Sequence, residues 1–483
     1  MKMKYEIVIG LEVHVELATE SKIFCSCSSK FGAEPNDNVC PACCGMPGML
    51  PVTNEKAIDL GITAGLLLNC HINRVTTFDK KSYYYPDLPN AYQITQWFSP
   101  VCVDGGLEIE TQAGKKVIGV KQIHLEEDAG KLVHDDWTDS TLVDFNRTGV
   151  PLVEIVSQPD LRSVEEVLAY LERLRAVLRF AKVSDCRLEL GSMRCDVNLS
   201  VRPYGSEKMG VRTEMKNMNS LSAIARAIEY EAARHIDAIE LGSETLIQET
   251  RRWDDISGKS FAMRSKETAE DYRYFPDPNL LPIVIEDEWI ERIRATLPEL
   301  PEKKAIRYVS ELGLTEESTA LITESRNLCD IFEAAYPISG SPRETANWLI
   351  MDCMSYLRSK QLSADDLVID PLKLGELIRI TIEGEITRNA ARRILTAVIE
   401  QDADPKKIIE EKGLSVQSDE GTILAIVERA VADNPKSVQD YRNGKTKAMQ
   451  AIFGCIMKEL KGNGDPQVIQ RLLKEVLENG TED

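Results

Sequence analysis

The chain has 483 residues, of which 43% are hydrophobic, and it carries a formal net charge of −20. This length exceeds one ordinary hydrophobic core, so two to four domains are expected. The negative charge argues against nonspecific nucleic-acid binding by the surface as a whole, but it is compatible with a local basic patch. Apolar runs long enough for a membrane helix and a signal-peptide core are both missing, which predicts a cytoplasmic protein without a membrane partner.

The first part of the chain is dominated by predicted strands. Residues 5–17 alternate between apolar and polar side chains, which places Glu12, His14 and Glu16 on one face of a strand and apolar residues on the other. Further strands are expected at 117–126, 152–156, 193–202 and 210–217. The last two are predicted to form a hairpin because a turn-rich segment joins them.

Helices are expected at 163–181, which opens with a capping box, and at 220–241, which ends at a glycine. After several prolines, the pattern changes to short helices, among them 343–357, 372–383 and 466–477. We therefore expect an α+β protein with a large mixed or antiparallel sheet and two small all-helical domains. The expected domains are 1–297, 298–405 and 406–483.

The segment 25–44 holds two closely spaced cysteine pairs. They are Cys25 with Cys27 and Cys40 with Cys43. Two such pairs on tight turns suit a tetrahedral Zn²⁺ site, and this spacing favours metal over free or buried thiols. The neighbouring Cys44 leaves the fourth ligand open between Cys43 and Cys44. Because four thiolates leave no open position on the metal, the zinc is expected to be structural.

Carboxylates in the first domain give the strongest catalytic signal. Glu12 and His14 share one face of the first strand and lie about 7 Å apart. Glu126 and Glu127 stand at a strand end, and Glu154 interrupts an apolar run, where a lone acid is seldom buried unless paired or metal-bound. A solvated sheet face is the alternative. Oxygen ligands with one imidazole suit Mg²⁺ or Mn²⁺, which favours phosphate chemistry.

Two other segments are candidate ligand surfaces. The predicted hairpin carries Asp196 on one strand and Glu214 on the other, either as an exposed ladder or as the floor of a nucleotide or RNA cleft. An aromatic loop with Tyr83 and Tyr85 follows Lys81, which suits stacking on a base, although a structural loop is the usual explanation. The glycine-rich phosphate loops G-x-x-x-x-G-K-[ST] and G-x-G-x-x-G do not occur, so a nucleotide would need a metal–carboxylate scheme.

Several longer motifs resemble the B subunit of the tRNA-dependent amidotransferase. They lie at 8–17, 31–36, 85–87, 124–131, 144–147, 271–276 and 443–445. The resemblance extends over essentially the whole chain. It implies a cradle-shaped kinase and transamidase domain, a helical domain, and a tail domain that binds tRNA.

The resemblance also implies a reaction with ATP. The side-chain carboxylate of mischarged Glu-tRNA(Gln) or Asp-tRNA(Asn), or of both, attacks the γ-phosphate, and ammonia then displaces phosphate. The products are Gln-tRNA(Gln) and Asn-tRNA(Asn). Because the chain lacks an amidase nucleophile, ammonia is expected through a channel from an amidase (glutaminase) A subunit. A small C subunit is a further expected partner.

The resemblance assigns Mg²⁺ to Glu12, His14, Glu127 and Glu154. It places Glu127 and Lys81 at the exit of the ammonia channel, where Glu127 is expected to accept a proton as the C–N bond forms. Other candidates for the substrate and channel region are Tyr83, Tyr85, Glu126, Arg147, Asp196 and Glu214. Some relatives lack the four thiols, so the zinc is expected to be dispensable to the reaction. A metal-dependent hydrolase and a noncatalytic zinc-containing RNA-binding protein are the alternatives.

Overall fold

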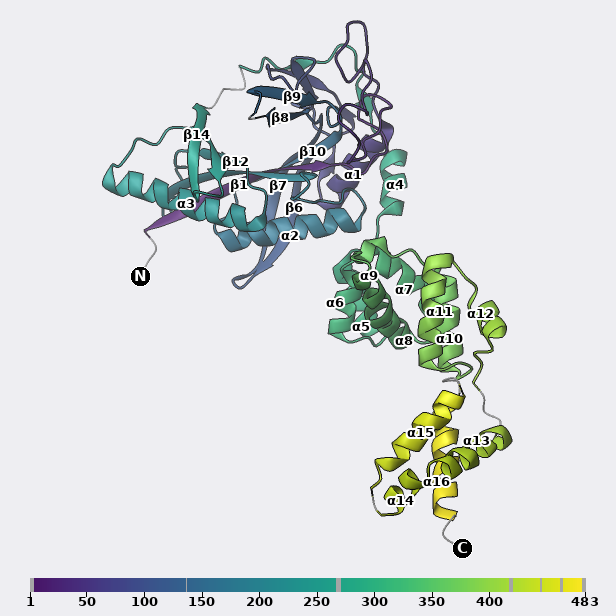
Figure 1. Ribbon diagram of the computed structural model, residues 1–483. Helices are drawn as coiled ribbons and strands as arrows, with labels where there is room; N and C mark the ends of the chain where they lie inside the picture. Colours follow the sequence, from purple (N-terminus) through teal and green to yellow (C-terminus); the bar gives the residue numbers. More distant parts are fainter. Residues whose placement is uncertain are drawn as a thin grey trace. The chain divides into compact units, whose positions relative to one another are not determined.

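The computed structural model describes residues 4–479 except 136, 266–270, 417–419, 444 and 461–463. Gly444 of the tail motif therefore lies outside the described residues. The chain divides into two compact units, Met1–Pro298 and Glu299–Asp483 (Figure 1). The first unit contains a large mixed sheet and the second is helical, which confirms the predicted α+β class.

A nine-stranded sheet forms the body of the first unit, in the order β14-β13-β12-β11-β1-β10-β7-β6-β2. The strands nearest its centre are β1 (Tyr5–Glu16), β10 (Pro151–Ser157), β11 (Met193–Pro203) and β7 (Gly114–Glu127). The others are β2 (His71–Ile72), β6 (Cys102–Thr111), β12 (Thr213–Lys216), β13 (Glu249–Asp254) and β14 (Lys259–Ser265). Because β12 and β13 pair in parallel while β1 pairs antiparallel with both neighbours, the sheet is mixed.

Three helices pack on one face of this sheet: α1 (Glu55–Leu67), α2 (Val164–Phe180) and α3 (Leu221–Leu241). The apolar residues of β1 face them and are almost completely buried, as Leu11 and Val13 show. Local signals set the helix ends as predicted. The Ser163 hydroxyl accepts a hydrogen bond from the backbone N–H of Glu166 at 3.1 Å, and α3 ends at Gly242, whose φ is 64°. The opposite face of the sheet is left for polar side chains.

Smaller sheets flank the end of β7. One joins β4 (Asp79–Ser82), β5 (Tyr92–Thr95) and β15 (Phe275–Pro276). The others pair β3 (Val75–Thr76) with β16 (Ile283–Val284) and β8 (Lys131–Asp135) with β9 (Ser140–Asp144). The unit closes with α4 (Asp287–Thr296). The pairing of β15 with β4 brings the 271–276 segment beside the aromatic loop, although almost 200 residues separate them in sequence.

The second unit begins with α5 (Pro301–Ser310), α6 (Glu316–Thr323) and α7 (Arg326–Ser339). The helix predicted at 343–357 is divided into α8 (Pro342–Asn347), a π-helical turn (Trp348–Cys353) and α9 (Met354–Ser359). The second unit continues with α10 (Pro371–Ile382), α11 (Arg388–Gln401) and α12 (Pro405–Lys412). The periodicity of apolar residues predicted the helix over 343–357, but no sequence pattern marks the π-helical turn within it.

The last four helices are α13 (Glu420–Asp433), α14 (Pro435–Arg442), α15 (Ala448–Glu459) and α16 (Pro466–Asn479). They bury one cluster of apolar side chains of their own, including Ile423, Ile452 and Leu473. Among the described helices of the whole chain, none has both the length and the apolar character needed to cross a membrane.

Candidate functional site

The polar face of β1 carries the candidate site. Strand register places His14 opposite Glu154 on β10 and opposite Arg194 on β11. It also places Glu12 opposite Asp196 on β11. Because side chains alternate along strands, these groups project from the face opposite α2 and α3. The predicted alternation along β1 is therefore confirmed in the structure.

One group on this face combines imidazoles and carboxylates. Ligand atoms of His14, Glu126 and Glu154 lie within 4.8 Å of one another. The His14 Nε2 atom is 3.5 Å from a carboxylate oxygen of both glutamates, and the His124 Nε2 atom is 2.9 Å from Glu154. Burial lowers the pKa of His14, but the two glutamates outweigh it and raise this pKa to about 9. Burial opposes ionisation of Glu154, yet the two imidazoles hold its pKa well below the usual range.

A second group contains only carboxylates. Oxygen atoms of Glu12, Asp196 and Glu214 lie within 4.8 Å of one another. Burial raises the pKa of Glu12, and repulsion from Glu154 and Glu214 raises it further. The Lys216 ammonium pairs with Asp196 and lies 3.0 Å from Glu214, so it offsets only part of this charge. Three clustered carboxylates are costly without a further cation, and oxygen donors suit Mg²⁺ or Mn²⁺.

The side chain of Glu127 belongs to neither group. It follows Glu126 on β7, so alternation turns it toward the other side of the strand. Its Oε1 atom accepts a hydrogen bond of 2.9 Å from the backbone N–H of Ile94 on β5. Burial raises the pKa of Glu127 to about 8. The expected ligand set is therefore divided: His14 and Glu154 lie with Glu126, Glu12 lies in the second group, and Glu127 lies apart.

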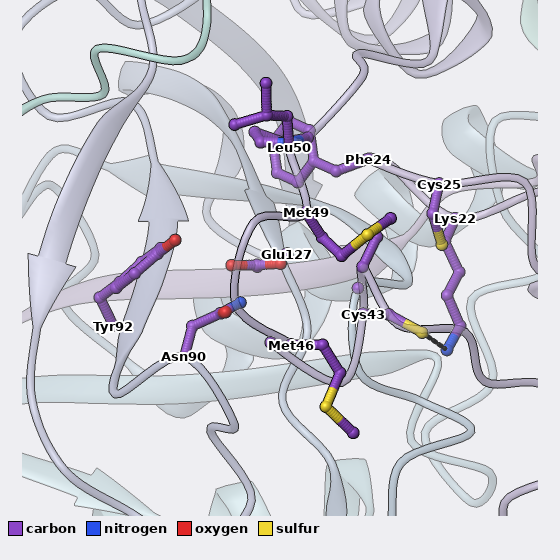
Figure 2. Close-up of a pocket in the computed structure, with 14 residues that line it drawn as sticks. Lys22, Phe24, Cys25, Cys43, Met46, Met49, Leu50, Asn90, Tyr92 and Glu127 are labelled. Atoms are coloured by element: carbon purple, nitrogen blue, oxygen red, sulfur yellow. Dashed lines mark hydrogen bonds between the residues drawn. The ribbon is translucent and has the colours of Figure 1, made fainter.

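Glu127 lines a small pocket beside the cysteine loop (Figure 2). Cys25 and Cys43 lie on one side of this pocket, and Tyr92 and Asn90 lie on the other. The remaining wall is mixed: Phe24, Met46, Met49 and Leu50 are apolar, whereas Lys22 is charged.

The four predicted zinc ligands come together. The sulfur atoms of Cys25, Cys27, Cys40 and Cys43 lie within 4.8 Å of one another, and Cys44 is not part of this group. The Lys22 ammonium is fully buried, and it lies 3.6 Å from the Cys43 sulfur and 3.1 Å from the carbonyl oxygen of Phe145. Hydrogen bonds from the Cys25 thiol and from the backbone N–H of Cys40 lower the pKa of Cys43. Four clustered cysteine sulfur atoms with a nearby cation suit a soft metal ion.

The aromatic candidates surround Lys81. Its ammonium lies 5.4 Å from the centre of the Tyr83 ring and 4.9 Å from that of Tyr272. The rings of Tyr83 and Tyr85 are 6.2 Å apart. Tyr272 received no role from sequence reasoning, because only the pairing of β15 with β4 brings it here. The only feature of the sequence that pointed to Tyr272 was its place in the 271–276 family motif.

Arg147 lies away from both carboxylate groups. Its guanidinium donates to the backbone carbonyls of Ala129 and Gly130 at 3.0 and 2.9 Å. It also lies 3.4 Å from Asp128, which pairs with Arg194 at 3.0 Å. Arg147 is therefore placed to stabilise the turn that follows β7.

Comparison with known proteins defines the family. Residues 7–291 match the model of the GatB/GatE catalytic domain, and residues 330–477 match that of the GatB domain. The chain therefore belongs to the GatB/GatE family. Curated relatives that are named as the B subunit of aspartyl/glutamyl-tRNA(Asn/Gln) amidotransferase confirm the resemblance predicted from the motifs. That of Lachnoclostridium phytofermentans is 50% identical over 98% of this chain and 99% of its own length. The relative from Caldicellulosiruptor bescii is 50% identical over 99% of this chain and 100% of its own length. The relative from Brevibacillus brevis is 48% identical over 98% of this chain and 99% of its own length.

Proposed function

We propose that the chain is the subunit of a tRNA-dependent amidotransferase that activates and amidates mischarged Glu-tRNA(Gln), Asp-tRNA(Asn) or both. The observation that carries the proposal is that two clusters of potential metal ligands lie on one face of the sheet. The chain is also 50% identical in sequence to a curated subunit of this kind. In the activation step an anionic carboxylate attacks the γ-phosphate of an anionic triphosphate, which forms an acyl phosphate and releases ADP, so the site must supply positive charge.

The two groups on the sheet face are the proposed sites for Mg²⁺ or Mn²⁺. One would use His14, Glu126 and Glu154, and the other Glu12, Asp196 and Glu214. A divalent ion bound there would neutralise charge on the phosphates and on the attacking carboxylate. His14 must be neutral to serve as a ligand, so metal binding would release its proton.

Glu127 is the proposed proton acceptor for ammonia. Its buried carboxyl group has a pKa of about 8, which suits proton exchange near neutral pH. Glu127 lines the neighbouring pocket, which is the proposed point of entry for ammonia, and Lys81 lies on β4, the strand that pairs with β5 beside this pocket. An amidase A subunit would supply this ammonia, and a small C subunit would complete the complex.

The helices of the tail domain, over 406–483, are proposed to bind tRNA. We retain the division into a helical domain over 298–405 and a tail domain over 406–483. The separate apolar cluster of the last four helices supports a tail that folds as its own domain. Residues 436–475 within this tail carry eight basic and four acidic residues although the whole chain is acidic, which suits contacts with a phosphate backbone.

A transamidation assay tests the proposed function. The complex reconstituted with its A and C subunits should form Gln-tRNA(Gln) or Asn-tRNA(Asn) only when ATP and the mischarged tRNA are both present. Phosphate release that needs ATP alone, without mischarged tRNA, would instead indicate a metal-dependent hydrolase.

The cysteine group predicts one zinc ion per chain. Replacing Cys27 with serine removes one of four clustered thiolates, so we expect the metal to be lost and the thermal midpoint of unfolding to fall. Replacing Cys44 with serine is the matched control, because Cys44 adjoins the group without belonging to it. Elemental analysis and thermal unfolding measure both effects. Equal metal content in the two variants would contradict the assignment.

A further inference from the structure

A fully buried ammonium group lies beside the cysteine group. The Lys22 Nζ atom is 3.6 Å from the Cys43 sulfur and 3.1 Å from the carbonyl oxygen of Phe145, and among the described residues it forms no ion pair with a carboxylate. A buried ammonium is strongly destabilising unless a negative charge lies next to it. The Cys43 sulfur, as a thiolate, is therefore the counter-charge of Lys22.

The same sulfur atom is placed for oxidation. The sulfur atoms of Cys43 and Cys40 lie 3.9 Å apart on one tight turn, and rotation of the two side chains can bring them to the S–S bond length of about 2.05 Å. Cys43 also lines the pocket of Figure 2, whose volume is about 40 Å³. This volume has room for a molecule little larger than water, so a small hydroperoxide can reach the sulfur.

We propose that Cys40 and Cys43 form a redox switch that responds to small hydroperoxides and stops amide formation. The Cys43 thiolate attacks the peroxide, whose O–O bond breaks to leave a sulfenic acid on Cys43 and, after uptake of a proton, water or an alcohol. The Cys40 thiolate then attacks that sulfur, the S–S bond forms, and the departing hydroxide takes up a proton to become water. The two sulfur atoms together lose two electrons, which the peroxide gains. Because two of the four zinc ligands are consumed, bound zinc is released.

The disulfide leaves the Lys22 ammonium buried without its counter-charge. Lys22 and Glu127 line the same pocket, so the ammonium is expected to turn into the pocket and pair with the Glu127 carboxylate (Figure 2). This ion pair occupies the proposed proton acceptor and leaves the two groups on the sheet face unchanged, a consequence that rests on the proposed function. Loss of zinc alone acts differently, because Cys27→Ser keeps the Cys43 thiolate beside Lys22 and should retain amide formation.

Titration of the reconstituted complex with hydrogen peroxide tests the switch. We expect zinc release, measured with a colorimetric chelator, and a Cys40–Cys43 disulfide in peptide mapping by mass spectrometry. Dithiothreitol and added zinc should reverse both. With ammonium as the amide donor, so that oxidation of the partner subunits has no influence, amide formation should fall about a hundredfold, the scale of lost proton transfer, while phosphate release continues. Cys44→Ser is the matched control and should respond like the wild type, because Cys44 lies outside the group.

Lys22→Met separates transmission through Lys22 from damage to the cysteine loop. Methionine has a similar length without a charge, so the oxidised variant has no ammonium to pair with Glu127. Its disulfide should form as in the wild type, yet its yield of amide per phosphate released should be equal in the oxidised and reduced states. An equal loss of amide formation in oxidised Lys22→Met would overturn the proposal.

The chemistry of the switch is measured without substrate. A wild-type disulfide that omits Cys43, or Cys43 that stays reduced while the peroxide oxidises other residues, would also overturn the proposal. These two measurements hold even if Lys22→Met fails to fold. They hold equally if the complex makes no amidated tRNA, an outcome that would refute the proposed function itself.

Discussion

Replacing Glu154 with glutamine is expected to reduce ATP-dependent transamidation by about 10³-fold, the upper range for removing one preorganised electrostatic group. Glu154 lies 2.9 Å from His124 and 3.5 Å from His14, so its charge holds both imidazoles in place. Glutamine has nearly the same shape but lacks the charge that would bind a divalent ion with His14 and Glu126. Initial rates of Gln-tRNA and Asn-tRNA formation by the reconstituted complex measure the effect.

Glu16→Gln is the matched control for this prediction. Glu16 lies on the same strand and alternates onto the same face as His14, but it belongs to neither carboxylate group. Its replacement should leave the rate within about threefold of wild type, the usual scale for a charge outside the site. Retained activity in Glu154→Gln or Glu154→Ala would contradict the proposed role and favour a noncatalytic RNA-binding protein.

Replacing Glu127 with glutamine is expected to abolish amide formation while ATP-dependent phosphate release and tRNA binding continue. The reason is the separation of the two sites: Glu126 faces the imidazole group, whereas Glu127 bonds to Ile94 and faces the other pocket. Glutamine keeps the hydrogen bond from Ile94 but cannot accept a proton from the attacking ammonia. Amide formation and phosphate release are measured in parallel on the same complex.

The pH dependence separates proton transfer from channel shape. The pKa of Glu127 is raised to about 8, so the fraction in the proton-accepting form increases as pH rises through 8. The wild-type rate of amide formation should therefore rise over this range, and Glu127→Gln should lose that rise. Added ammonium salt bypasses the partner's ammonia supply. Full rescue of Glu127→Gln by ammonium would assign Glu127 to the channel wall and contradict its role as proton acceptor.

Local patterns in the sequence predicted the sheet face well. Alternation along β1 placed Glu12 and His14 correctly, and the interruption of an apolar run identified Glu154. The choice between Glu126 and Glu127 is different. Alternation shows that two consecutive carboxylates cannot share a face, but only pairing of β7 with β10 decides which one meets His14. That register is a long-range property, which no local pattern reveals.

Contacts between distant segments account for the other differences. His124 was not selected as a site residue, although it contacts Glu154 at 2.9 Å once β7 and β10 pair. Tyr272 reaches Lys81 only because β15 adds to the small sheet beside β4. Short cysteine spacings, in contrast, restrict a loop directly, so the clustering of four sulfur atoms followed from the sequence alone.

The most direct test of the proposed function is transamidation by the reconstituted complex with Glu-tRNA(Gln) and Asp-tRNA(Asn), each with and without ATP. We predict amidated tRNA and one phosphate released per amide formed, only when ATP and at least one of these tRNAs are present. Amide formation without ATP would contradict the proposed activation step. Phosphate release without any amidated product, with glutamine and the partner proteins supplied, would contradict the proposed transfer of ammonia.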